Sequence, residues 1–460
     1  MIPLESLTSC FQGLIPAWLC TCSRAGVPNV AILSHVDYVD PRHVALSFQF
    51  FNKSKRNIME NPKAMVRFYD PDTMQAYAMR LRFARTETEG PTFEAMRLRI
   101  EAIASYSGLK GIFKLLGADI YEVLSVQAVD YEVGAPKAVA RALTSPAARL
   151  PFTMKALQEI SEQIQKAPTL DSLLDAILET LEKNFGFRHS MLLLASERPD
   201  RLEMIASRGY PEGGVGSEVG FGEGIIGMVA EARKPIRISG MLRAMLYANA
   251  VGKRAHERGL HTAERRIPLP GLPEPESQLG IPLIVRDELL GVLCIETDRS
   301  YRFHEEDRAY IEVLGGYLAI AIQNALLRER TEDPEERPAA SARPAPPIAP
   351  GCRSRIHVEY YKTDECILVD GQYLVRSLPA KILWKLLHEN HSSRSVEFTN
   401  RRLRLDKTLN LPDFKDNLES RLILLRRRLE ERCPEIRIAQ SGRGRFRLEL
   451  GGEVALVEQP

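Results

Sequence analysis

The sequence predicts a multi-domain chain in which a small β barrel is followed by an α/β domain and then by an α+β domain. At 460 residues the chain is too long for a single hydrophobic core. Residues 331–350 contain six prolines and five alanines and almost nothing that could be buried, which is typical of a disordered linker. Strand patterns dominate before residue 135, whereas helical spacing appears after residue 150. The predicted domains are therefore residues 1–135, 150–330 and 353–450, with the linker at 331–352 and a short polar tail.

The composition is that of an ordinary soluble protein, with 44% hydrophobic and 27% charged residues. No apolar run approaches the roughly 20 residues that span a bilayer, and the start MIPLESLTSC lacks the features of a signal peptide. We therefore expect a cytoplasmic protein with no membrane contact. The seven cysteines are scattered, which argues against a disulfide framework, and no Cys/His pairs have zinc-site spacing, so no metal is expected.

Basic residues are concentrated at the C-terminal end. Residues 351–460 hold 21 Lys and Arg against 16 Asp and Glu, or +5, whereas the first 350 residues hold 41 against 44, or −3. This asymmetry favours an acidic polymer as the partner of the C-terminal domain.

The first domain is rich in strand patterns. Two β-rich runs, 17–24 and 29–39, flank an AGVP hairpin signal, and 43–51 alternates with Val44, Leu46, Phe48 and Phe50 on one face. Further strands are expected at 76–88 and 119–130, with a helix at 91–105 between them. Many strands with few helices predict a small β barrel.

The runs LCTCSRAGVPNV, SFQFF and SKRNIMENPKAMV resemble the pyridoxamine 5'-phosphate oxidase-like FMN-binding split barrel, over about residues 10–130. The resemblance implies FMN as the cofactor, with deazaflavin or haem still open. Ammonium groups, a hydroxyl and helix N–H groups suit a phosphate dianion, although a solvated basic turn would have the same sequence. No catalytic acid and base accompany this set, so no catalytic residue is assigned. The implied phosphate contacts are Lys53, Ser54 and Lys55, with Arg80 and Arg82 as weaker candidates.

The middle domain opens with two helices. Apolar residues recur at helical spacing over 153–183, Pro168 separates the two helices, and Thr169 is placed to cap the second. Strands follow at HSMLLLAS and RLEMIAS. A long amphipathic helix is expected over 303–327.

The motifs GEGIIG, IPL…GVL and FHEED…AIAIQNA, in this order, resemble the GAF domain family over the whole middle segment. The resemblance implies either a small-molecule pocket between sheet and helices or a dimerisation module, and the terminal helix is expected to make a dimer contact. Residues 240–270 would cover the pocket with a cationic lid suited to an anionic ligand, whereas the alternative, favoured at least as much by the sequence, is a solvated connecting helix. Cys294 is expected in the core. The candidate ligand contacts are Arg243, Tyr247, Lys253 and His256.

The last domain combines strands, three helices and a basic hairpin. Strands are expected at 356–361 and 366–375 with an Asp370-Gly371 turn, helices after Ser377, near FTNRRLRLDKTL and over 414–432, and a hairpin over 435–450. Four leucines of the third helix are expected in the core: Leu418, Leu422, Leu425 and Leu429.

This order of elements resembles the OmpR-type winged helix, with NLESRL, LRRRLE and GRGRFRL as its most specific pieces. The resemblance implies that the third helix enters the major groove of double-stranded DNA while the hairpin lies on the backbone. Leu424 departs from the polar residue usual on that face. An Arg-rich helix in a protein-binding module is the alternative. The implied DNA contacts are Asn417, Ser420, Arg421 and Arg428 on the helix and Arg443 and Arg445 on the hairpin.

Taken together, the three segments predict a ligand- or redox-responsive transcriptional regulator that binds DNA as a homodimer. A flavin-dependent oxidoreductase with regulatory appendages is the alternative from another class. A purely architectural scaffold, with both pockets empty, remains a third.

Overall fold

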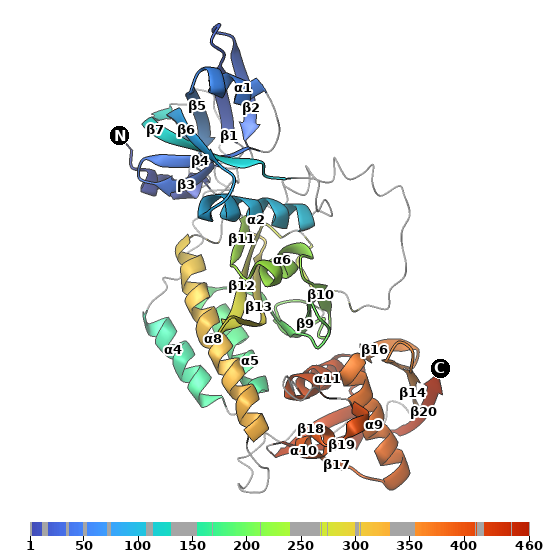
Figure 1. Cartoon of the computed structure of the whole chain (residues 1–460). Coiled ribbons are helices and arrows are strands. Elements are labelled where there is room, and N and C mark those ends of the chain that lie inside the picture. The colour runs from blue at the N-terminus through green and yellow to red at the C-terminus, as the bar shows by residue number, and fades with distance from the viewer. Residues whose placement is uncertain are drawn as a thin grey trace.

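In the computed structural model the three domains follow one another from top to bottom of Figure 1, in chain order. The structure describes residues 2–11, 17–33, 36–48, 53–70, 75–106, 114–129, 154–167, 169–211, 213–239, 267, 269–273, 275–299, 303, 305–331, 355–409, 411, 418–442 and 444–459.

The N-terminal domain is one seven-stranded antiparallel sheet of order β2-β1-β5-β6-β7-β4-β3. Alternating apolar residues of its strands form the core, together with Leu4, Leu7 and Phe11 of η1. Since β2 and β3 are edges of this sheet, the predicted barrel is confirmed only as an antiparallel sheet. Its elements are η1 (Leu4–Phe11), β1 (Ala17–Cys22), β2 (Pro28–Leu33), β3 (Val36–Asp40), β4 (His43–Phe48), α1 (Lys53–Glu60), β5 (Lys63–Tyr69), β6 (Ala76–Glu87), α2 (Pro91–Tyr106) and β7 (Gly117–Val129).

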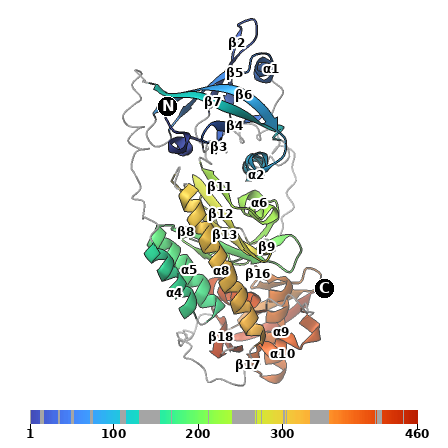
Figure 2. The same cartoon turned by 60° about the vertical axis from the view of Figure 1, so that its left-hand side comes forward.

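Helix α2 lies between the N-terminal and middle domains in both views (Figures 1 and 2). Met96 and Ile100 pack against Ala45 of β4, which is why this strand is buried on both faces rather than alternating as predicted. Leu98 and Ala102 belong instead to the core of the middle domain. The helix therefore joins two cores that the sequence divides between separate domains.

The middle domain is a six-stranded antiparallel sheet of order β10-β9-β8-β13-β12-β11. Helices α4, α5 and α8 cover one face, while α6 and α2 cover the other (Figure 2). The elements are α4 (Met154–Lys166), α5 (Leu170–Phe185), β8 (His189–Ala195), β9 (Arg201–Arg208), β10 (Glu218–Gly220), α6 (Gly224–Ala232), β11 (Ile236–Ser239), β12 (Ser277–Val285), β13 (Glu288–Thr297) and α8 (Glu305–Thr331).

Two local sequence signals of the middle domain are confirmed. Thr169 caps α5 by accepting a hydrogen bond from the Ser172 N–H, and the Ser172 hydroxyl in turn accepts one from the Thr169 N–H. In the GEGIIG motif, Gly227 brings the first turn of α6 against Gly220, since a Cβ at Gly227 would overlap the Gly220 carbonyl oxygen. The motif therefore fixes how closely α6 approaches β10.

Helix α8 has two apolar sides. By length and composition its segment Asp307–Leu327 could cross a membrane, contrary to the expectation that no such run exists, but a third of it is buried in the fold. That buried side packs onto the sheet through Ile311, Leu314, Leu318 and Ile322. The opposite side is exposed and carries Tyr310, Val313, Tyr317, Ile320 and Leu327.

The C-terminal domain contains two sheets, of order β16-β15-β14-β20 and β17-β19-β18, with helices packed between and beside them. The predicted strands, three helices and hairpin are confirmed. The expected polar tail is instead strand β20, parallel to β14. The elements are β14 (Arg355–Tyr361), β15 (Cys366–Val369), β16 (Gln372–Arg376), α9 (Ser377–Ser393), β17 (Glu397–Thr399), α10 (Asn400–Arg404), η3 (Lys407–Leu409), α11 (Leu418–Arg432), β18 (Ile436–Gly442), β19 (Arg445–Leu450) and β20 (Glu453–Gln459).

Candidate functional site

Helix α11 is buried on two sides. Leu418, Leu422, Leu425 and Leu429 lie in the core of the C-terminal domain, as predicted from their spacing. The opposite side faces the middle domain, where α11 lies against β9 and α5. The arginine-bearing helix is therefore an interdomain element in this structure (Figure 1).

Arg421 forms the buried centre of this interface. Its guanidinium pairs with the Glu203 carboxylate on β9 and donates a hydrogen bond to the Ala195 carbonyl oxygen at 3.4 Å. Glu197 lies 3.7 Å from its Nε. With only 3% of the residue exposed, Arg421 has exchanged water for acids of the middle domain.

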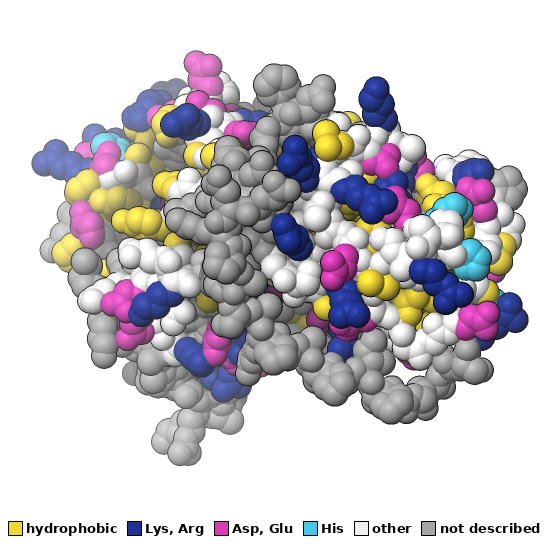
Figure 3. Space-filling model, turned by 90° about the horizontal axis from the view of Figure 1, so that it is seen from below, with side chains coloured by type: hydrophobic (Ala, Val, Ile, Leu, Met, Phe, Trp, Pro, Cys, Tyr) yellow, Lys and Arg dark blue, Asp and Glu magenta, His cyan; other side chains and the backbone are white. Residues whose placement is uncertain are grey.

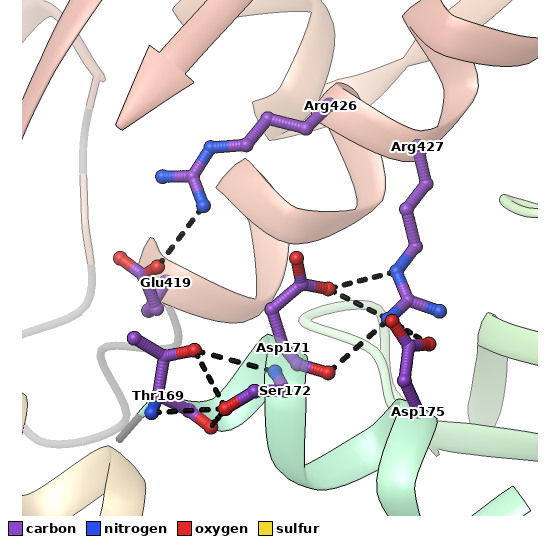
Figure 4. A network of polar contacts seen from close by, with 7 residues as sticks. All are labelled: Thr169, Asp171, Ser172, Asp175, Glu419, Arg426 and Arg427. Carbon is purple, nitrogen blue, oxygen red and sulfur yellow. Dashed lines mark hydrogen bonds and ion pairs between the residues drawn. The ribbon is translucent and has the colours of Figure 1, made fainter. Parts of the chain in front are cut away.

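Arg427 makes a second cross-domain contact, shown in Figure 4. Its guanidinium donates to Asp171 Oδ1 at 2.6 and 2.9 Å and to Asp175 Oδ1 at 2.7 Å, both in the first turns of α5. Burial raises the pKa of Asp175, although Arg427 opposes that shift. Burial also disfavours the charge on Arg427, but the two aspartates outweigh it and raise its pKa.

A third contact lies at the end of β16. Arg376 pairs through its Nε and Nη2 with the two carboxylate oxygens of Glu218 on β10, with Nε at 2.5 Å from Oε1. Arg198 and Arg201 of the middle domain also lie 3.7 Å from Glu218. These contacts set three arginines of one domain against five acids of the other.

Apolar contacts complete the interface. Ile423 of α11 is fully buried and belongs to the core of the middle domain, whereas Val215 of the middle domain belongs to the C-terminal core. The side chains of Leu424 and Glu431 lie against Gly216 and Gly213 of the β9–β10 loop. The loop and the helix are therefore closely packed at these two glycines.

The predicted DNA contacts are placed differently by the structure. Ser420, Arg421 and Arg428 are each 3% exposed and do not face solvent. Arg428, predicted on the groove-facing side, here donates from its Nε to the Leu374 carbonyl oxygen at 3.0 Å inside the C-terminal domain. Arg445 is exposed at the start of β19. Asn417 and Arg443 lie outside the described residues.

The predicted phosphate site of the N-terminal domain is only partly assembled. Lys55, rather than facing an open site, pairs with Asp119 at 2.5 Å, donates to Thr86 and lies over the rings of Phe48 and Phe83. A carboxylate at this position opposes a phosphate, so Lys55 does not fit the predicted role as arranged.

The other four predicted contacts are spread over α1 and β6. Ser54 is buried and accepts a hydrogen bond from Asn29 at 2.8 Å, whereas Lys53 is exposed beside it at the start of α1. Arg80 is exposed on β6, and Arg82 pairs with Glu122 at 3.2 Å. The start of α1 is thus the part of the site that could still receive an anion.

A buried polar cluster lies on the α6 face of the middle sheet. Glu296, 4% exposed, accepts hydrogen bonds from the Tyr210 hydroxyl at 3.0 Å, the Leu272 N–H at 3.1 Å and the Gln278 amide. The buried Gln278 Oε1 has no partner among the described residues. Burial raises the pKa of Glu296, and the three donors only partly offset it.

This cluster was missed by sequence reasoning, although Glu296 is an acid inside the apolar strand run GVLCIET. The predicted ligand contacts Arg243, Tyr247, Lys253 and His256 lie outside the described residues. Cys294 is fully buried, as predicted. Among the described residues no group of His, Cys, Asp and Glu could hold a metal ion.

The raised pKa of Glu296 predicts a pH effect on stability. Between the ordinary carboxyl pKa and the raised pKa of the folded state, Glu296 is ionised in the unfolded chain but still protonated in the folded one. The free energy of unfolding therefore falls as the pH rises through this range. Glu296→Gln should therefore remove part of this loss, measured as the urea midpoint against pH. The exposed Glu288→Gln is the control, and identical slopes for wild type and Glu296→Gln would contradict the prediction.

Comparisons with known proteins assign the middle domain. A family model described as the GAF domain matches residues 167–323, and no curated protein matches the chain. The GAF domain of a phosphoenolpyruvate-protein phosphotransferase from Coxiella burnetii is 25% identical, with a TM-score of 0.30, over 40% of this chain and 99% of that one. The corresponding Acinetobacter domain is 21% identical, with a TM-score of 0.29, over 37% and 92%.

An FMN-binding protein from Syntrophomonas wolfei is 17% identical, with a TM-score of 0.23, over 28% of this chain and 88% of that one. The assignment rests on the family model rather than on these likenesses. The middle domain of this chain, over residues 167–323, is therefore a GAF domain.

Proposed function

We propose that the chain is a cytoplasmic, ligand-responsive regulator in which the GAF domain senses a small molecule and the C-terminal domain binds double-stranded DNA. One observation carries the proposal: the arginine-bearing helix α11 lies directly on the GAF domain, so a ligand-induced change in that domain would alter what α11 can contact. The order of strands, three helices and basic hairpin supports a winged-helix output.

The DNA-binding part is tested with the full chain and a labelled random-sequence duplex over a salt series at low ionic strength. Arg445 and Arg447 are exposed on β19 of the basic hairpin and are proposed to contact phosphates. Each lost phosphate contact should reduce the salt slope by about 1. Arg445→Ala should therefore flatten the slope, whereas Lys166→Ala on α4 should not. Absence of salt-dependent binding at every concentration would reject the function.

The buried cluster around Glu296 is proposed as the floor of the ligand pocket. The Glu296 carboxyl and the unpartnered Gln278 Oε1 both accept hydrogen bonds, so this floor suits a ligand group with N–H or O–H donors. Mass spectrometry of the purified chain identifies a co-purifying ligand.

We also propose a homodimer formed through α8. Its exposed apolar residues, named here the α8 seam, are spaced three and four apart from Tyr310 to Ile320 and continue through Asn324 to Leu327. This spacing is that of a coiled-coil seam, in which one polar Asn fixes the register of a two-stranded pair.

The dimer proposal predicts that Tyr317→Glu and Ile320→Glu together convert the chain to a monomer, since two charges would be buried per helix at the seam. Light scattering coupled to size exclusion measures the mass. Glu312→Gln on the same helix is the control. A wild-type chain that is monomeric at micromolar concentration would contradict the proposed dimer through the α8 seam.

FMN remains the proposed cofactor of the N-terminal domain, with Lys53 and the first N–H groups of α1 as its phosphate contacts. Lys55 could join them only by leaving Asp119. Bound FMN would supply redox chemistry to the domain. Flavin absorbance of the purified chain, and its loss in Lys53→Glu, test the proposal, and rapid oxidation of a reduced nicotinamide would favour the oxidoreductase alternative.

A further inference from the structure

We infer that the GAF domain holds the C-terminal domain in a state closed to DNA, with its acidic residues occupying the side of α11 that would enter a groove. The inference rests on the proposed DNA-binding function of that domain. It concerns five acids, named here the acidic clamp: Asp171, Asp175, Glu197, Glu203 and Glu218.

The clamp covers α11 sterically. Ser420 and Arg421 are almost fully buried, and Arg421 reaches across to a strand of the GAF sheet. A recognition helix must enter a major groove about 12 Å wide to place such side chains on base edges. Because β9 and α5 lie within hydrogen-bonding distance of α11, the helix cannot enter a groove while the clamp is closed.

The clamp also places negative charge against α11, as the phosphates of DNA would. On α11, carboxylates pair with Arg421 and Arg427, the kind of side chain that pairs with phosphates and guanine edges. On the face of the molecule seen in Figure 3, basic side chains are interspersed with acidic ones. Nucleic acid and clamp would therefore compete for the same arginines.

One segment connects the clamp to the proposed ligand pocket. Strand β9 carries Glu203 against Arg421, and just after it Tyr210 donates its hydroxyl hydrogen to Glu296. The loop that follows presents Gly213 and Gly216 to α11. A ligand that displaces Tyr210 from Glu296 would shift this segment and weaken the clamp.

The test neutralises three of the five clamp acids without touching the C-terminal domain. In the full chain, Asp171→Asn, Asp175→Asn and Glu203→Gln are combined, and binding to a labelled random-sequence duplex is measured by fluorescence anisotropy. We expect at least a tenfold tighter affinity than wild type. A control triple variant of exposed acids, Glu89→Gln, Glu162→Gln and Glu231→Gln, has the same change in net charge and should tighten binding by less than threefold.

The outcomes separate the two proposals. Equal affinities for wild type and clamp variant, both measurable and salt-dependent, overturn the closed state while leaving DNA binding intact. An equal gain in the clamp and control variants also overturns it, because charge alone would then explain the effect. No binding by any variant rejects the DNA-binding function itself, and the inference with it.

Discussion

Replacing Arg421 by alanine is expected to destabilise the docking of the C-terminal domain on the GAF domain by about 3–5 kcal/mol, because it leaves Glu203 buried without its partner. The cost comes mainly from the stranded charge rather than from the lost attraction. Glu203 has only one other side-chain partner among the hydrogen bonds described, the Ser196 hydroxyl at 2.8 Å. One hydroxyl does not replace a guanidinium.

The measurement is a double-mutant cycle on the free energy of unfolding in urea, in which a spectroscopic probe in each domain monitors the unfolding of that domain. Arg421→Ala alone should uncouple the two transitions. In the cycle, Arg421→Met and Glu203→Leu are made singly and together, and the double variant should recover much of the loss, since two apolar side chains leave no charge behind. Arg447→Ala on the exposed side of β19 is the control and should change the free energy of unfolding by less than about 0.5 kcal/mol. Additive single and double changes would show that the pair is not coupled.

The sequence predicted which side of α11 packs into the C-terminal core, but not that the other side packs on the GAF domain. The leucines at 418, 422, 425 and 429 recur at helical spacing, so their burial in the local core followed from periodicity. The partners of Arg421 and Arg427 lie 218 and 256 residues away, and no local pattern encodes a contact of that range. Leu424 was the available signal, because an apolar residue on a face expected to meet DNA indicated protein contact.

Other differences between the predicted and the observed contacts also arise because the partners are distant in the sequence. Lys55 was predicted to meet a phosphate from its neighbours in sequence, but its charge is matched by Asp119, 64 residues later. Helix α2 was predicted as a helix, yet its role in two cores depends on how the domains pack. Local features such as the Thr169 cap and the GEGIIG turn were predictable, because the residues that form them are adjacent in the chain.

The GEGIIG turn supports the second large effect. Gly227→Ala is expected to destabilise the GAF domain by about 1–3 kcal/mol, at the upper end of that range, because the added Cβ would overlap the backbone oxygen of Gly220. A flexible side chain could move aside, but a carbonyl fixed between β10 and α6 cannot move without shifting the helix.

Gly316→Ala provides a matched comparison, because its expected effect on the free energy of unfolding has the opposite sign. Gly316 is also within a helix, but it is exposed on α8 and a Cβ there meets no atom within 4 Å. Alanine should therefore stabilise α8 by up to about 1 kcal/mol through helix propensity alone. Urea unfolding of both variants against wild type measures the two shifts. If both replacements moved the midpoint in the same direction, close approach at Gly227 would not be what the motif provides, and the reason for its third glycine would have to lie elsewhere.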